Sequence, residues 1–160
     1  MRHANPGRLV SPWRHKAKVL AAFLALCLVT AFSGIGFAAE AGEPVKVVYH
    51  ISEGLEQASN GLRNIRNHLS VDPTARIVVV THAGGINFLL EGAKDKNGNP
   101  YDAAVDDLSM KGAEFRVCNF TLQSRNIDKS KVHPEAKIVP SGVAEVARLQ
   151  SREGFAYLKP

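Results

Sequence analysis

The chain has 160 residues, of which 45% are hydrophobic, and its formal net charge is +5. Five of its 20 basic residues precede the first acidic residue, so the rest of the chain carries 15 basic and 15 acidic residues. Those five are Arg2, Arg8, Arg14, Lys16 and Lys18. Without them the charge is balanced, which excludes the strongly basic surface of a nucleic-acid-binding protein.

Residues 1–38 have the pattern of a secretory signal peptide. The basic segment is followed by an apolar run over 19–29 and by the small residues Ala38, Ala39 and Ala41, which is the order of a charged region, an apolar region and a cleavage site. We expect cleavage after Ala38 to Ala41, a short tether over 39–44 and a single domain over 45–160. An uncleaved membrane anchor is the alternative, because the apolar run approaches the length of a bilayer span.

This leader predicts an exported protein, periplasmic in a bacterium, that touches a membrane only through the leader before cleavage. One of the two cysteines, Cys27, leaves with the leader. The mature chain then has Cys118 alone and no internal disulfide. Its thiol is therefore buried and inert, reactive, or paired between chains.

The mature part alternates between strand and helix patterns. Strands are predicted by β-branched and apolar runs over 45–50, 76–81, 112–118, 137–139 and 155–158. Helices are predicted over 53–70, 86–92, 99–111, 122–126 and 143–152 from apolar residues at spacings of three and four and from end signals. Ser52, Asn99 and Ser141 are the predicted N-caps, and Gly112 and Gly154 are the predicted helix ends.

Short connections between alternating strands and helices favour a three-layer α/β/α fold. We expect a mostly parallel sheet of about five strands between helical layers. About 120 mature residues are enough for one domain with a real hydrophobic core. The pattern does not determine the order of the strands in the sheet.

Three of the predicted strands end on residues with chemical capacity, His50, His82 and Cys118. In a parallel sheet the carboxyl ends of the strands lie at one edge, where ligands bind in open α/β folds. A helix amino end or a neighbouring imidazolium would stabilise the Cys118 thiolate and lower its pKa. Gly84 and Gly85 would leave backbone N–H groups free at a helix start to seat an anion.

Each of these residues also has a simpler interpretation. A free cysteine at the end of a core strand often only fills space, and His82 can instead hydrogen-bond the turn that follows it. His50, His82 and Cys118 together would suit copper or zinc, although their spacing matches no metal motif. The chain has no serine-hydrolase elbow, P-loop or dinucleotide fingerprint, so we predict no cofactor.

Several segments resemble the DsrE/DsrF-like family, which includes sulfur-relay proteins. They are residues 62–69, 77–86, 88–90, 112–122, 139–143 and 149–160, and the last resembles the ending of exported members. The resemblance implies a three-layer α/β/α fold and homo-oligomers, often trimers or hexamers. It also implies a cysteine that accepts sulfur as a persulfide and passes it to a partner, a role that only Cys118 can take. His82 matches a histidine common in this branch.

The leading hypothesis is a periplasmic sulfur carrier in which Cys118 is the sulfur-accepting thiol. His82 would stabilise or orient the thiolate. The binding residues of the site would be Gly84, Gly85, Asn119 and His50. Because one cysteine cannot resolve itself, the protein would serve donor and acceptor proteins and would not be a stand-alone enzyme. The alternative is a non-catalytic oligomeric module that binds a small anion or a protein at the same edge through Gly84, Gly85 and His82.

Overall fold

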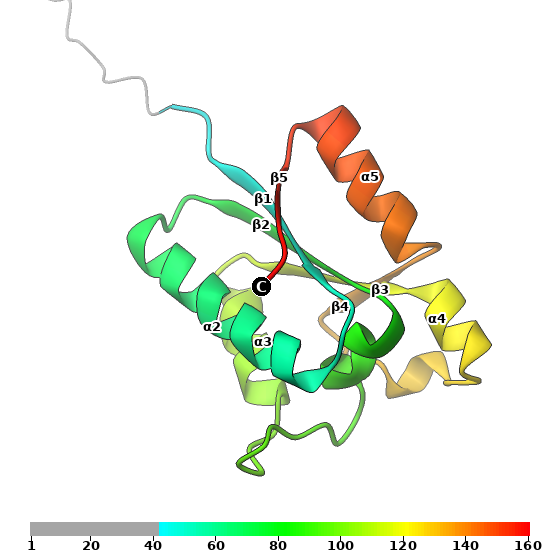
Figure 1. Ribbon diagram of the computed structural model, residues 1–160. Coiled ribbons are helices and arrows are strands. Elements are labelled where there is room, and N and C mark those ends of the chain that lie inside the picture. The colour runs from blue at the N-terminus through cyan, green and yellow to red at the C-terminus, as the bar shows by residue number, and fades with distance from the viewer. Residues whose placement is uncertain (1–41) are drawn as a thin grey trace, which may run out of the picture. The chain divides into compact units, whose positions relative to one another are not determined.

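The alternating strand and helix patterns assemble into one parallel sheet with helices on both faces (Figure 1). The computed structural model describes residues 42–160, so the predicted leader lies outside the described residues. The strands are β1 (Lys46–Ile51), β2 (Arg76–Thr81), β3 (Glu114–Cys118), β4 (Ala136–Val139) and β5 (Ala156–Leu158). Their order is β4-β3-β2-β1-β5 and every pairing is parallel, which confirms the predicted fold class.

The connecting helices follow the predicted sequence of elements with shifts at their starts. They are α2 (Leu55–Val71), α3 (Asp102–Met110), α4 (Asn119–Ser124) and α5 (Gly142–Glu153), with the 3-10 helices η1 (Ala83–Leu89) and η2 (Lys129–Lys131). For α5 the predicted cap is confirmed, since the Ser141 hydroxyl accepts a hydrogen bond from the Ala144 N–H. Gly154 ends α5 at φ 71°, as predicted.

Two predicted caps are wrong. Ser52 does not cap α2, because Gly54 precedes the helix and the Gln57 side chain accepts from the Ser52 N–H at 2.8 Å. Asn99 does not cap α3, because its side chain and N–H bind Asp95 within a turn and the helix begins only after Tyr101. The helical segment predicted over 86–92 is present with different bounds, as the 3-10 helix η1 over 83–89.

One face of the sheet is covered by α2, η1 and α3. Successive side chains of a strand point to opposite faces, and this alternation places Tyr49, Val79 and Phe115 on this face. They pack against Ile65 of α2 and Leu108 of α3 in the larger hydrophobic cluster. Gly61 of α2 allows close packing, because a Cβ there would lie 2.9 Å from the Ile51 side chain.

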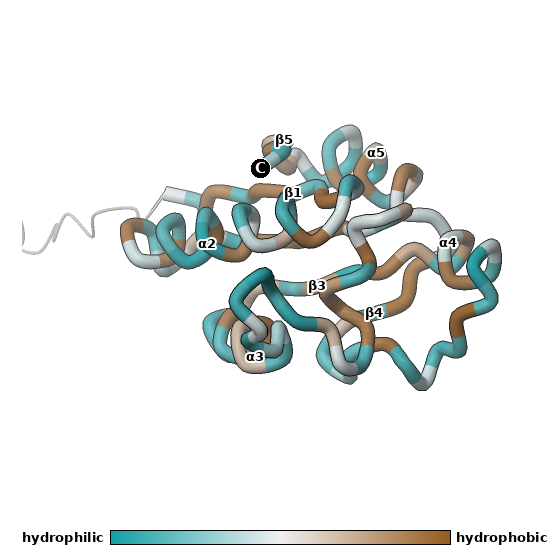
Figure 2. Tube along the Cα trace, turned by 60° about the horizontal axis from the view of Figure 1, so that its bottom comes forward, coloured by the Kyte–Doolittle hydropathy of each residue, from teal (hydrophilic) through white to brown (hydrophobic). Residues whose placement is uncertain are grey.

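The opposite face is covered by α5. Val48, Val78 and Val80 form a smaller cluster with Val146 and Leu149 of this helix. Figure 2 shows hydrophobic colour concentrated along the strands and hydrophilic colour on the outer sides of the helices. The apolar contact of α5 is therefore made over β1 and β2, and β3 contributes no residue to this cluster.

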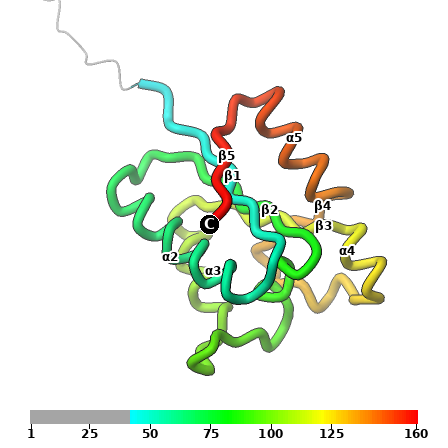
Figure 3. Tube along the Cα trace, in the orientation of Figure 1, coloured from blue at the N-terminus to red at the C-terminus, as the bar shows by residue number. Residues whose placement is uncertain are grey.

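The last strand, β5, lies beside the first. It pairs with β1, with Tyr157 opposite Val48, so segments from the two ends of the domain lie side by side (Figure 3).

Across residues 42–160, none of the helices combines the length and the apolar character needed to span a bilayer.

Candidate functional site

The carboxyl edge of the sheet brings three predicted residues to the same end of the fold. His50 lies opposite Val80 in the register of β1 and β2, His82 directly follows β2, and Cys118 is the last residue of β3. Because the three strands are parallel and adjacent, their carboxyl ends lie at one edge. The predicted convergence of these strand ends is confirmed.

Cys118 lies at the junction between β3 and α4. The chain passes from strand to helix without a loop, so the first N–H groups of α4 have no partner within the helix. Burial raises the pKa of the Cys118 thiol. Hydrogen bonds from the Gly142 N–H, the Thr121 hydroxyl and the N–H groups of Thr121 and Phe120 lower it, and the net result is a pKa below the ordinary value. These donors favour the thiolate.

The side chain of Thr121 links Cys118 to the neighbouring strand end. Its Oγ1 accepts a hydrogen bond from the Ala83 N–H at 3.0 Å, in the segment that follows β2. The same hydroxyl lowers the pKa of Cys118. Because a hydroxyl both donates and accepts, the bond from Ala83 leaves the Thr121 proton available to another acceptor.

Position 142, the first residue of α5, is occupied by a glycine because a side chain there would be crowded. A Cβ there would lie 3.0 Å from the Thr81 carbonyl oxygen, 3.1 Å from the His82 Cβ and 3.3 Å from the Cys118 Cβ. Glycine therefore lets the first turn of α5 approach the edge of the sheet beside Cys118.

His50 and His82 bind each other. Their Nε2 atoms lie 2.7 Å apart, and the Nδ1 of His50 lies 2.8 Å from the hydroxyl of Tyr157. One Nε2 must donate and the other must accept, so the geometry does not admit a proton on both Nε2 atoms. Burial, His82 and Lys159 lower the pKa of His50, and burial lowers the pKa of His82.

This pairing changes the role predicted for His82. Its pKa is lowered and its Nε2 faces His50, so near neutral pH the ring supplies no positive charge to the thiolate. The groups that lower the pKa of Cys118 are instead backbone N–H groups and Thr121. The turn after His82 is held by its backbone, whose carbonyl accepts from the Gly85 N–H at 2.9 Å. An orienting role for His82 stays a prediction.

The two glycines after His82 have a packing role. A Cβ on Gly85 would lie 2.0 Å from the Ile51 carbonyl oxygen, and one on Gly84 would lie 2.8 Å from that of Glu53. Because the Gly85 N–H already donates to the backbone carbonyl of His82, the predicted anion site has no free donor at Gly85. This is a correction, and its cause is the close crossing of η1 over the end of β1. Binding through Gly84 stays a prediction.

The remaining predicted residue, Asn119, begins α4. Its side-chain Oδ1 is buried and finds no hydrogen-bond partner in the described part of the chain, so its binding role stays a prediction. The copper or zinc alternative has no support in residues 42–160, where no three His, Cys, Asp or Glu side chains converge as metal ligands.

The residues around Cys118 that the sequence did not reveal are Gly142 and Thr121. The sequence pattern predicts a helix start at Ser141 after a strand, which places Gly142 at the same edge. The contact of Gly142 with Cys118 requires that β4 lie beside β3, and the pattern does not contain that order. Two apolar side chains at the starts of α4 and α5, Phe120 and Val143, are each 63% exposed.

Comparisons with known proteins agree with this fold. The model of the DsrE/DsrF-like family matches residues 37–160. A structure of protein MTH1491 from Methanobacterium thermoautotrophicum, described as of unknown function, is 30% identical, with a TM-score of 0.65 over 72% of this chain and 99% of that one. The YchN protein from E. coli is 15% identical, with a TM-score of 0.60 over 71% of this chain and 96% of that one. No curated protein matches the chain. The chain belongs to the DsrE/DsrF-like family.

Proposed function

We propose that this member of the DsrE/DsrF-like family is a sulfur carrier, in which Cys118 accepts a sulfane sulfur atom as a persulfide. The observation that supports this proposal is the set of N–H and O–H donors around the Cys118 sulfur, which lowers the pKa of a thiol that burial alone would raise. Family membership is compatible with a sulfur-relay role. A purely structural cysteine needs no such donors.

The loading step needs no external oxidant or reductant. The Cys118 thiolate attacks the outer sulfur of a donor persulfide, R–S–SH, and a new S–S bond forms at Cys118. The S–S bond of the donor breaks, and its electron pair leaves with the inner sulfur as the thiolate R–S⁻. The proton of the transferred sulfur stays with it, so the products are Cys118–S–SH and the donor thiolate.

Unloading repeats this exchange with a second protein. An acceptor thiolate attacks the outer sulfur of the Cys118 persulfide, and Cys118 leaves as a thiolate that the same N–H donors stabilise. No other cysteine follows the leader, so the chain cannot resolve its own persulfide. The protein therefore functions as a carrier between donor and acceptor proteins and not as a stand-alone enzyme.

The proposal extends to location and assembly. The basic and apolar leader supports export to the periplasm, and fractionation of cells expressing the full chain tests it. The resemblance of the segments supports a homo-oligomer, trimeric or hexameric. Light scattering on the mature protein measures its mass, and a monomer at micromolar concentration would contradict the assembly.

Sulfur loading is tested directly by intact mass. The mature protein is incubated with glutathione persulfide, and a gain of the mass of one sulfur atom is expected for the native chain. Cys118→Ser should gain none, and dithiothreitol should remove the added sulfur from the native chain. Equal loading of the two proteins would overturn the carrier proposal.

A binding module without chemistry is the second candidate function. It is favoured by the 5% exposure of Cys118, which limits access to the sulfur. In this case iodoacetamide should modify the thiol only after unfolding. A thiol that reacts in the native protein, with a midpoint below the ordinary thiol pKa of about 8.5, would contradict the second candidate.

A further inference from the structure

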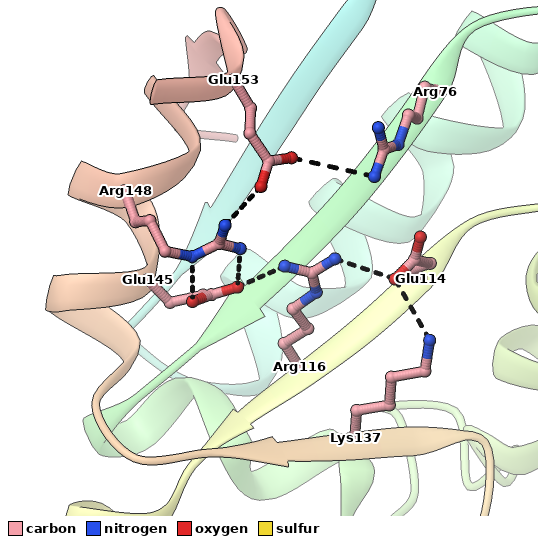
Figure 4. Close-up of polar contacts among 7 residues, drawn as sticks. All are labelled: Arg76, Glu114, Arg116, Lys137, Glu145, Arg148 and Glu153. Atoms are coloured by element: carbon pink, nitrogen blue, oxygen red, sulfur yellow. Dashed lines mark hydrogen bonds and ion pairs between the residues drawn. The ribbon is translucent and has the colours of Figure 1, made fainter. Parts of the chain in front are cut away.

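A chain of charged side chains crosses the face of the sheet that α5 covers (Figure 4). Arg116 of β3 lies at its centre, only 9% exposed. Its guanidinium forms ion pairs with Glu114 of the same strand, at 2.9 Å, and with Glu145 of α5. Arg148 also binds Glu145, at 2.8 Å. Arg116 and Glu145 therefore join the sheet to the helix.

The helix α5 is held by two different kinds of contact. Val146 and Leu149 pack on the valines of β1 and β2, a contact that is not directional. On the side of β3 the contact is the ion pair of Glu145 with Arg116. The planar guanidinium donates in fixed directions, so it binds a carboxylate only in a narrow range of orientations. The apolar contact thus attaches the helix, and the ion pair determines how the helix lies over β3.

This ion pair is close to Cys118 along both elements. Arg116 precedes Cys118 by two residues on β3, so both side chains point to the face that α5 covers. Glu145 lies three residues after Gly142, and its N–H donates to the Ser141 carbonyl at 3.0 Å in the first helical turn. Residues three apart on a helix are neighbours. A shift of Glu145 therefore moves Gly142 with it.

We infer that Arg116 and Glu145 are positioning residues: their ion pair holds the first turn of α5 against β3 and so keeps Gly142 beside Cys118, where a Cβ on the glycine would lie 3.3 Å from the Cys118 Cβ. Neither residue needs to touch a sulfur donor. The inference rests on the proposed function for its meaning, since a positioned thiolate matters only if the thiol reacts.

The guanidinium fork explains why an arginine occupies this position. Its two terminal nitrogens bind two different carboxylates: Nη1 binds Glu145 and Nη2 binds Glu114. A lysine would keep the positive charge but presents a single ammonium group, which cannot reproduce the planar fork. Arg116→Lys therefore separates geometry from charge.

Charge and geometry predict opposite effects for Glu145. Removing a negative charge near a thiol stabilises its thiolate and lowers the pKa. Removing the anchor of α5 weakens the hydrogen bond from Gly142 and raises the pKa. The other titratable groups on elements packed around Cys118 include His82 after β2 and Arg125 after α4, and neither is altered.

The experiment measures the rate of iodoacetamide alkylation of Cys118 against pH, by intact mass, in the full mature protein. We expect Glu145→Ala and Arg116→Lys each to raise the midpoint by about one pH unit, a tenfold loss of thiolate at pH below the midpoint. A lower midpoint in Glu145→Ala would show that charge alone acts, and an unchanged midpoint in both variants would overturn the inference.

Glu114→Ala is the matched control. It removes the other carboxylate from the same guanidinium but leaves the contact between β3 and α5, so its midpoint should not rise. A rise equal to that of Glu145→Ala would mean that any loss at Arg116 is sufficient, which contradicts the anchoring of α5. Circular dichroism identifies a variant that fails to fold, and Arg116→Lys, which keeps every charge, then decides the result.

Failure of this inference is distinct from failure of the proposed function. If Cys118 of the native chain loads sulfur but the variants keep its midpoint, the carrier stands and the positioning role falls. If the variants shift the midpoint but the native chain takes up no sulfur from glutathione persulfide, positioning stands and the carrier falls.

Discussion

The two faces of the sheet are built in different ways. The face under α2 and α3 is a continuous apolar core that includes Phe88, Phe115 and Leu108, all without exposed surface. The face under α5 has a smaller apolar cluster over β1 and β2 and a charged network over β3. Both faces belong to the same five strands, so the difference comes from what alternate residues of β3 present.

This difference separates stability from chemistry. Apolar packing tolerates rearrangement as long as volume is preserved, whereas hydrogen bonds and ion pairs require particular distances and directions. The site at Cys118 needs such directions, because its thiolate depends on N–H groups of α4 and α5. We therefore expect mutations on the first face to change stability alone, and mutations on the second to change the thiol as well.

The largest effect is expected on the apolar face. Phe115→Ala leaves a cavity among buried aromatic rings, since Phe88 packs against Phe115 with ring centroids 6.2 Å apart. We expect the free energy of unfolding, measured in urea, to fall by about 3–5 kcal/mol. In the folded protein the alkylation midpoint of Cys118 should stay unchanged. Phe120→Ala, at an exposed phenylalanine, should cost less than about 0.5 kcal/mol.

A smaller loss of stability with a change at the thiol is expected for Gly142→Ala. The new methyl group would crowd the Thr81 carbonyl, His82 and Cys118 at 3.0–3.3 Å, so α5 must move away from the sheet. Overpacking of this kind costs about 1–3 kcal/mol, and the alkylation midpoint should rise. Val143→Ala, at the exposed next residue of the same turn, is the control. A tight site is ruled out if both variants leave the midpoint where it is.

The cap of α5 tests the same helix without touching the sulfur. Ser141→Ala removes the hydroxyl that accepts from the Ala144 N–H, and we expect a loss of about 1 kcal/mol in urea unfolding. Ser141→Thr keeps the hydroxyl and should recover most of that stability. Equal losses in the two variants would assign the effect to crowding near Gly142.

The smallest effect is a pH dependence from His50 and His82. Both have a lowered pKa when folded, so below about pH 6.5 the unfolded chain binds more protons than the folded one and stability falls as the pH falls. The contribution of the two histidines to the stability of the folded protein is present above that pH and is lost on acidification toward their folded pKa values. The slope should be well below the roughly 1.4 kcal/mol per pH unit of one full proton, because both rings are partly exposed to water.

This dependence is measured by urea unfolding between pH 5 and 8. The double variant His50→Gln and His82→Gln should show a flatter profile than the native protein, while His68→Gln, which alters a histidine on α2, serves as the control. Identical profiles for the native and double-variant proteins would show that folding does not lower the pKa values of His50 and His82.

Local sequence signals predicted the elements where the signal and the structure depend on the same neighbours. The strand predicted over 76–81, whose centre is the apolar run 77–80, is β2. Ser141 and Gly154 mark the two ends of α5 as predicted. Ser52 and Asn99 carry the same type of signal but are not caps, because α2 begins only after Gly54 and the side chain of Asn99 donates to Asp95. A capping residue is decided by competition with nearby polar groups, which the residue type alone does not reveal.

The sequence by itself determined the parallel α/β fold and the meeting of His50, His82 and Cys118 at one edge, because strand periodicity and strand direction follow from local pattern. Only the tertiary structure decided which groups touch. The order β4-β3-β2-β1-β5 places Gly142 on Cys118 and pairs the two histidines with each other. These contacts join residues far apart in the chain, and hydrogen bonds that depend on a few tenths of an ångström cannot be read from spacing along the sequence.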